Sequence, residues 1–268
     1  MDSELRSRLM TGLKDGSIVP YLGPGVLADV VSTASGEPMP ATSDQLIISL
    51  NGGKPMSPKL MYEFPRAAMN IELKRGRAAV TRFLNTTYGD TRWSRSAMHD
   101  WLQAIRPPYV IDINRDTQLI DSYADTPHTL ILGCARIGGT DYRFKLYACD
   151  RTGYQEITPE RADTSVPILF KPMGAPKPKP SYIASDADYV DFITELMGGF
   201  AVPTFVKSQN AAPRQALPAA RNAPEPRYRT HGVVRPDLQR RRPRRLGADR
   251  EPDEQGTALP GQTRHRTD

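Results

Sequence analysis

The chain has 268 residues, of which 38% are hydrophobic and 25% charged, and it carries a net charge of +6 at pH 7. This length allows one large domain or two small ones with a hydrophobic core. No run of about 18 consecutive apolar residues occurs and the N-terminus contains no apolar h-region, so we predict no contact with the membrane and no secretory signal. Cys134 and Cys149 show no CxxC spacing. We therefore expect a cytoplasmic protein with two reduced, buried thiols.

The net charge is concentrated near the C-terminus. Residues 208–268 hold 13 arginines, no lysine and 7 acidic residues, which accounts for the whole excess of +6. This segment has no Ile, Phe, Trp or Met, and it contains eight prolines. It has too little apolar surface to offset its ordering entropy. We therefore predict an α/β domain at 1–207 and a disordered Arg/Pro-rich tail at 208–268.

The arginine-rich part of the tail, at 240–250, is open to three interpretations. Its composition favours a solvated tail without a fixed partner. It also suits a tether to nucleic acid or to an anionic surface, and nucleic acid is a candidate partner only through this segment. Finally, the abundance of Arg, Pro, Ala and Gly is what out-of-frame translation of GC-rich DNA would give.

The first half of the ordered region is predicted to be mainly helical. Apolar residues recur at helical spacing in 2–14, 42–50, 58–88 and 94–105. We expect Ser43 or Asp44 to cap the second stretch. The third should contain two helices, one interrupted at Pro65 and the next separated from it near Gly76. The last stretch has one apolar face, formed by Met98, Trp101, Leu102 and Ile105.

The strands of the domain are predicted from short apolar runs bounded by turn residues, at 17–23, 109–114, 128–137, 142–150 and 166–172. The third and fourth should pair around Gly138-Gly139. A last helix follows, capped by Ser185 or Asp186 and ended by Gly198-Gly199. Alternating helices and strands predict an α/β fold, Rossmann-like, with a largely parallel sheet flanked by helices.

Three strand ends carry residues suited to ligand binding. The strand in VPYLGPGVL runs into Gly23-Pro24-Gly25, and such a turn allows the backbone to approach a ligand phosphate. The segment matches neither G-x-G-x-x-G nor the P-loop, so a purely structural turn is the alternative.

The second strand end, in YVIDINRD, delivers Asn114, Arg115 and Asp116. An amide both donates and accepts hydrogen bonds, which suits a ribose hydroxyl or a carboxamide. Asp116 is equally suited to capping the next helix. The third strand end, in ILFKPMGAP, places Met173 and Gly174 after its strand.

In order and spacing, these segments resemble the bacterial branch of the sirtuin-like family that lacks a zinc module. The family pattern is a strand entering G-A-G-x-S, a strand running into T-N-x-D, a strand carrying K-x-H-G, and then S-x-x-D-Y. Here the corresponding residues are LGPGVL at 22–27, INRD at 113–116, KPMG at 171–174 and SDADY at 185–189. The resemblance spans about residues 17–206. The segments LMYEFPRAAM and ITELMGGFAVP resemble, in sequence, a sirtuin-like group encoded beside bacterial nitrogen-fixation genes.

The resemblance implies a Rossmann-type sheet that binds NAD or ADP-ribose at the strand ends. Asn114 and Asp116 would lie beside the nicotinamide ribose and carboxamide and are the only catalytic candidates. The residues implied in cofactor binding are Gly23, Pro24, Gly25, Val26, Asn114, Asp116 and Gly174.

The departures from the family pattern bear on catalysis. Met173 occupies the position of the family's histidine, which acts as the general base, and a thioether cannot accept a proton at neutral pH. Leu27 replaces the serine of the glycine loop. Two cysteines cannot supply the four-cysteine zinc site of protein-deacylating sirtuins, so no zinc is expected. His99 and His128 are expected to be structural or exposed.

Three functions are consistent with this pattern. The first is a protein that binds NAD or ADP-ribose with weak or no catalysis. The second is an NAD glycohydrolase that releases nicotinamide, although loss of a general base typically costs ~10²–10⁴-fold in rate. The third is a non-catalytic structural protein with a protein partner, its pocket closed by Pro24, Leu27 and Met173.

Overall fold

The computed structural model describes residues 3–135, 142–150, 152–199 and 201–209. All of them belong to one compact unit, Met1–Arg221. Helix α8 (Thr204–Gln209) crosses the predicted boundary at 207 by two residues. The rest of the predicted tail and the Gly138-Gly139 turn lie outside the described residues, so the disorder of the tail stays a prediction.

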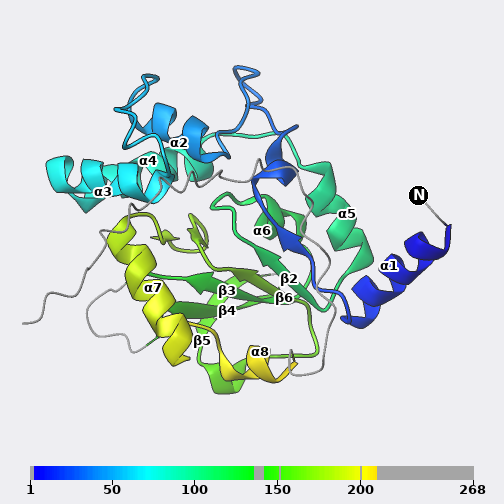
Figure 1. Ribbon diagram of the computed structural model, residues 1–268. Coiled ribbons are helices and arrows are strands. Elements are labelled where there is room, and N and C mark those ends of the chain that lie inside the picture. The colour runs from blue at the N-terminus through cyan, green and yellow to red at the C-terminus, as the bar shows by residue number, and fades with distance from the viewer. Residues whose placement is uncertain (1–2, 136–141, 151, 200, 210–268) are drawn as a thin grey trace, which may run out of the picture. The chain divides into compact units, whose positions relative to one another are not determined.

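A six-stranded sheet forms the centre of this unit (Figure 1). Its strands lie in the order β1-β2-β6-β3-β4-β5. Their bounds are Tyr21–Leu22 for β1, Tyr109–Asp112 for β2, His128–Gly133 for β3, Phe144–Asp150 for β4, Gly153–Ile157 for β5 and Ile168–Lys171 for β6. The pairs β1–β2, β2–β6 and β6–β3 are parallel, and only β4 runs against its neighbours. The predicted α/β class with a largely parallel sheet is confirmed.

The sheet differs from the prediction in three details. β5 was not predicted, because its exposed, polar sequence GYQEI lacks the apolar run of a buried strand. β1 has only two residues, where seven were expected from 17–23. The strand order also differs from the 3-2-1-4-5-6 order of the Rossmann dinucleotide-binding sheet.

Helices cover both faces of the sheet (Figure 1). On one face Leu130 and Leu169 pack with α5 (Ala97–Ile105) and α6 (Gln118–Ser122). On the other face Ile131 packs with α7 (Asp186–Gly198) and α8. This alternation of side chains between the two faces follows from the two-residue period of a strand.

The remaining helices are α1 (Ser3–Asp15), α2 (Ser43–Leu50), α3 (Phe64–Arg75) and α4 (Arg77–Asn85). Figure 1 shows α2, α3 and α4 grouped together apart from the sheet. They share a hydrophobic core of their own, which also takes in Leu27 after β1 and Ala184 before α7. A short two-stranded sheet, β7 (Gly174–Ala175) and β8 (Ser181–Tyr182), follows β6.

Helix boundaries agree with the sequence where local signals are strong. α7 is capped by Ser185 and ends before Gly199, which has φ = 90°. Gly76 separates α3 from α4 as predicted. Pro65 does not interrupt a helix as we expected, because it lies in the first turn of α3, where no N–H is needed. The cap of α2 is Thr42 rather than Ser43 or Asp44, since Thr42 forms a reciprocal capping box with Gln45.

The predicted apolar face of α5 is wrong in part. Leu102 is buried, but Met98 and Trp101 are 42% and 45% exposed. The residue that accompanies Leu102 into the interior is His99, which is fully buried. Helical spacing identified an apolar stripe, but packing against the sheet selected the neighbouring one.

Candidate functional site

The three strand ends singled out in the sequence meet at one cavity. Because β1, β2 and β6 are parallel neighbours, their carboxyl ends lie at the same edge of the sheet. Pro24, Asn114 and Met173 follow these strands, and all three line a cavity of about 300 Å³. Its opposite wall comes from Ser43 on α2 and Phe64 on α3. The expected convergence of the three motifs is thus present.

The cavity is lined mainly by aromatic and apolar side chains. Tyr21, Phe64, Tyr88 and Tyr189 contribute rings. The Tyr88 hydroxyl donates to the Pro40 carbonyl at 2.6 Å, and burial raises the pKa of this phenol. No Asp, Glu, His or Cys is among the lining residues. None of the described lining residues is therefore of a type that commonly acts as a general base at neutral pH.

The two glycines on either side of Pro24, which itself lines the cavity, have no packing reason to be glycine. Neither Gly23 nor Gly25 has a positive φ. A Cβ built at either position meets nothing within 4 Å. Neither the backbone conformation nor the packing of the core therefore requires glycine at these two positions. The space that a side chain would occupy is open.

Asn114 joins the first two strand ends. Its Nδ2 group donates to the Gly23 carbonyl at 3.0 Å and to Asp112 Oδ1 at 2.8 Å. Its carbonyl oxygen accepts no hydrogen bond from any described residue. An amide held in this way presents a fixed acceptor to the cavity.

Among the described residues, Arg115 is the only charged one that lines the cavity. Its side chain is almost buried, with the residue 8% exposed, and its guanidinium lies 5.1 Å from the centre of the Phe64 ring. Nε and Nη2 donate to the Ile183 carbonyl at 2.9 and 2.6 Å. Within the described part of the chain no carboxylate pairs with it. Buried charges are ordinarily paired, so this guanidinium is suited to an anionic ligand.

Five predicted site residues do not line the cavity: the two glycines beside Pro24, and Val26, Asp116 and Gly174. Val26 packs against the two neighbouring cores. Gly174 has φ = 80° and lies in the β7–β8 pair, where a Cβ would come within 1.9 Å of the Ser181 carbonyl oxygen. Asp116 is fully buried, and its Oδ1 accepts from the Gln118 amide at the start of α6. The sequence had left open a role for Asp116 as the N-cap of this helix; the N-cap is Thr117, and Asp116 bonds the first amide of the helix from the position before it.

A cluster of four ionisable side chains lies at the ends of β2 and β6. Lys171 Nζ is 2.6 Å from Asp112 Oδ2, and His99 Nε2 is 3.6 Å from the same oxygen. Burial raises the pKa of Asp112, but the Lys171 ammonium and His99 outweigh it and bring the pKa below its usual range. Asp116 completes the cluster, and burial, reinforced by the charge of Asp112, raises the pKa of its carboxyl. We refer to these four residues as the buried cluster.

Sequence reasoning placed Arg115 at a strand end but gave it no role, and it missed most of the buried cluster. A usable signal was present in Asp112 and Lys171, because each ends an otherwise apolar strand in YVID and ILFK. A charged residue there must find a buried partner. His99 was expected to be structural or exposed and proves buried. His128 is buried and structural, with its ring nitrogens at 2.7 Å from the Thr126 carbonyl and 2.9 Å from the Tyr154 hydroxyl.

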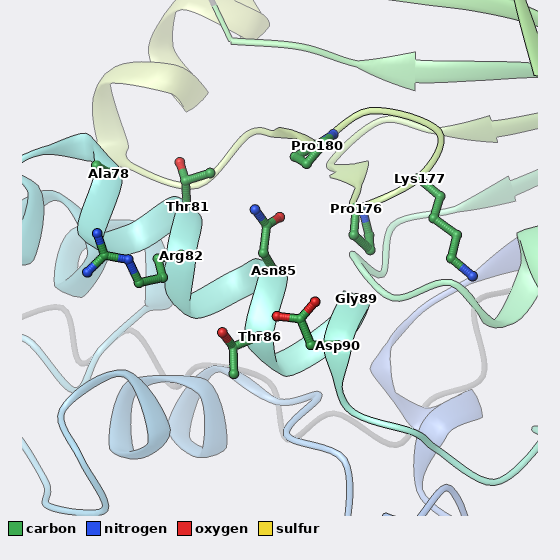
Figure 2. Close-up of a pocket in the computed structure, with 10 residues that line it drawn as sticks. All are labelled: Ala78, Thr81, Arg82, Asn85, Thr86, Gly89, Asp90, Pro176, Lys177 and Pro180. Atoms are coloured by element: carbon green, nitrogen blue, oxygen red, sulfur yellow. The ribbon is translucent and has the colours of Figure 1, made fainter.

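A second hollow, of about 560 Å³, lies between α4 and the loop that carries Pro176 and Pro180 (Figure 2). Figure 2 shows Asn85 and Asp90 on its helical side and Pro176 and Pro180 on the facing loop. Lys177 points away from Asn85 and Asp90, and its ammonium lies 3.2 Å from Asp121. None of the predicted site residues lines this hollow.

Comparison with known proteins gives no family assignment. No model of a protein family matches the sequence, and no curated protein matches it. Within the described ranges, no three or more His, Cys, Asp or Glu side chains are grouped so as to hold a metal ion. None of the described helices combines the length and apolar character that crossing a bilayer requires.

Proposed function

We propose that the cavity at the ends of β1, β2 and β6 binds a nucleotide that contains ADP-ribose, such as NAD or ADP-ribose itself, with little or no catalysis. The observation that carries this proposal is the unpaired guanidinium of Arg115 in an aromatic cavity. A nucleotide combines the two matching properties, an anionic phosphate and a flat base.

Two further features support the nucleotide. The open space at Gly23 and Gly25 allows a phosphate to approach the backbone. The free oxygen of Asn114 suits a ribose hydroxyl or a carboxamide N–H. The sirtuin-like resemblance of the sequence places a dinucleotide at the same strand ends. That resemblance implies a Rossmann-type sheet. The observed sheet agrees with it only in the parallel strands β1, β2, β6 and β3.

Weak or absent catalysis is proposed because no general base lines the cavity. Met173 occupies the position where the family has histidine, and His99 lies in the buried cluster rather than on the wall. We expect no nicotinamide release from NAD above the uncatalysed background. Rapid release would favour the glycohydrolase function instead.

The proposal is tested by titrating NAD and ADP-ribose into the full-length protein and recording the thermal midpoint. A ligand that binds only the folded state stabilises it by ~2.7 kcal/mol at ~100 times its Kd, which is readily detected. No shift with either nucleotide would contradict the proposal and would favour the structural-partner function.

Arg115→Gln is expected to weaken ADP-ribose binding by about 10- to 100-fold, because a hydrogen bond to a charged group contributes ~1.5–3 kcal/mol. Calorimetric titration measures this loss. Arg82→Gln is the matched control, since it removes the same charge from the hollow in Figure 2. A loss of affinity in Arg82→Gln but not in Arg115→Gln would move the binding site to that hollow.

Gly25→Ala is expected to leave the midpoint of the free protein unchanged and to weaken ADP-ribose binding at least about tenfold, or ~1.4 kcal/mol. The first result follows because the added Cβ meets no protein atom within 4 Å. The second follows from the proposed approach of a phosphate to the backbone of this turn, which an added methyl group would obstruct. Gly23→Ala provides an independent second variant. Unchanged affinity in both variants would show that the turn does not contact the nucleotide.

A further inference from the structure

The buried cluster is sealed from solvent and adjoins the nucleotide cavity. His99, Asp112, Asp116 and Lys171 are each 0% exposed. Asp112 Oδ1 accepts from both the backbone N–H and the side-chain amide of Asn114. Asp116, two residues after Asn114, is itself a member of the cluster and is fully buried. The segment 113–117, which carries Asn114 and Arg115, is therefore anchored in the cluster at both ends.

The ion pair between Lys171 and Asp112 does not account for all the ionisable groups of the cluster. Asp112 and Lys171 neutralise each other at 2.6 Å. This leaves one carboxyl and one imidazole, on Asp116 and His99. A net charge in such surroundings costs several kcal/mol. The pair is neutral only with one proton, either as a carboxylic acid beside a neutral imidazole or as a carboxylate beside an imidazolium.

The atoms that would carry this proton form no hydrogen bond with any described residue, although His99 Nε2 lies 3.6 Å from Asp112 Oδ2. Asp116 Oδ2 and both ring nitrogens of His99 are buried without a hydrogen bond. Polar atoms in the interior are ordinarily hydrogen-bonded, so three orphan atoms in one cluster require an explanation. A shared proton supplies the charge balance that the protein atoms otherwise lack.

We propose that Asp116 and His99 hold one shared proton at neutral pH, and that this proton keeps the segment 113–117 in its ligand-binding position. Both residues are positioning residues, since neither lines the cavity. Loss of the proton leaves one uncompensated negative charge beneath Asn114 and Arg115. The retention of the proton is independent of nucleotide binding, and only its effect on affinity rests on the proposed function.

The neighbours of the pair determine the sign of the pH dependence. Lys171 on β6, Asp112 on β2 and Tyr88 beside α4 face Asp116, while Asp100, next to His99, pairs with Arg95 outside the cluster. Burial, with the charge of Asp112, raises the pKa of Asp116 in the folded state. A raised pKa gives stability that is present at low pH and lost as pH rises towards the folded-state pKa.

The proton is detected by urea denaturation at several pH values between about 5 and 8, which span the ordinary pKa of histidine. In the unfolded chain His99 releases its proton near pH ~6.5, whereas the folded cluster retains one. The folding equilibrium constant of the wild type should therefore fall up to about tenfold per pH unit above that point. Asp116→Asn needs no proton for neutrality, so its profile should lack this fall.

Two further variants make the test decisive. Asp121→Asn, a half-exposed aspartate paired with Lys177, should keep the wild-type slope. His99→Gln should extend the fall to lower pH, towards the ordinary range of an aspartate near pH ~4, since Asp116 alone must then stay protonated. A fall in Asp116→Asn equal to that of the wild type overturns the proposal. Should that variant not fold, a His99→Gln profile identical to the wild type overturns it.

The positioning role is tested by measuring the Kd for ADP-ribose over the same pH range. The Kd of the wild type should rise towards pH 8, while that of Asp116→Asn should stay constant. A pH-independent Kd in a wild type whose stability falls with pH would overturn the positioning role. Absence of binding at every pH would contradict the proposed function, whereas the urea profiles would still decide whether the proton is held.

Discussion

Replacing Asp112 with asparagine is expected to lower the free energy of unfolding by about 3–5 kcal/mol at neutral pH, because it leaves the Lys171 ammonium buried without its counter-ion. Both residues are 0% exposed, so water cannot take over from the lost carboxylate. Asparagine keeps the size of the side chain, so the change isolates the charge. Urea denaturation measures the loss.

The matched control for this change is Asp100→Asn. Asp100 also pairs with a cation, Arg95, at 2.7 Å, but the two side chains are 48% and 40% exposed. An exposed ion pair of this kind contributes at most about 1 kcal/mol. Equal effects of the two substitutions would show that Lys171 does not depend on Asp112 for its charge compensation.

The pH dependence of the Asp112 contribution runs opposite to that of Asp116. The pKa of Asp112 is lowered in the folded state, so its stabilising effect is present above its ordinary pKa and is lost as pH falls through the lowered value. Two aspartates four residues apart in the chain thus affect stability in opposite directions.

Gly174→Ala is expected to lower the free energy of unfolding by about 3 kcal/mol or more. The residue has φ = 80°, a strained region for alanine that costs ~1–3 kcal/mol. The new Cβ would also lie 1.9 Å from the Ser181 carbonyl oxygen, which forces the β7–β8 pair apart at a further ~1–3 kcal/mol. Thermal and urea denaturation both measure the effect.

Gly76→Ala separates the two contributions to that effect. Gly76 has the same φ of 80°, but a Cβ there meets nothing within 4 Å. Its substitution should therefore cost only the backbone strain. A loss in Gly174→Ala no larger than that in Gly76→Ala would show that the β7–β8 pair adjusts to the added methyl group.

The contrast between these glycines matters for the proposed nucleotide site. The sequence grouped Gly174 with Gly23 and Gly25, since all three follow an apolar strand. The structure gives them different roles: Gly174 is required by the protein's own backbone, while Gly23 and Gly25 leave space unfilled. Only the latter two support ligand binding.

The sequence by itself determined the features that depend on neighbouring residues. The strand–turn pattern placed Pro24, Asn114 and Met173 at strand ends, and parallel pairing then brings such ends to one edge. The ends of α7 follow from Ser185 and Gly199, which cap it locally. The predicted boundary of the tail depends only on amino-acid composition, which is known without the structure.

Only the tertiary structure decided which side chains are paired, and with what. Asp112 finds Lys171 59 residues away, and Arg115 finds the Ile183 carbonyl 68 residues away but no carboxylate among the described residues. Helical spacing on α5 could not show that His99 faces inward instead of Trp101. Burial and charge compensation depend on neighbours from distant segments, because the free energy of a charge is fixed by whatever surrounds it after folding.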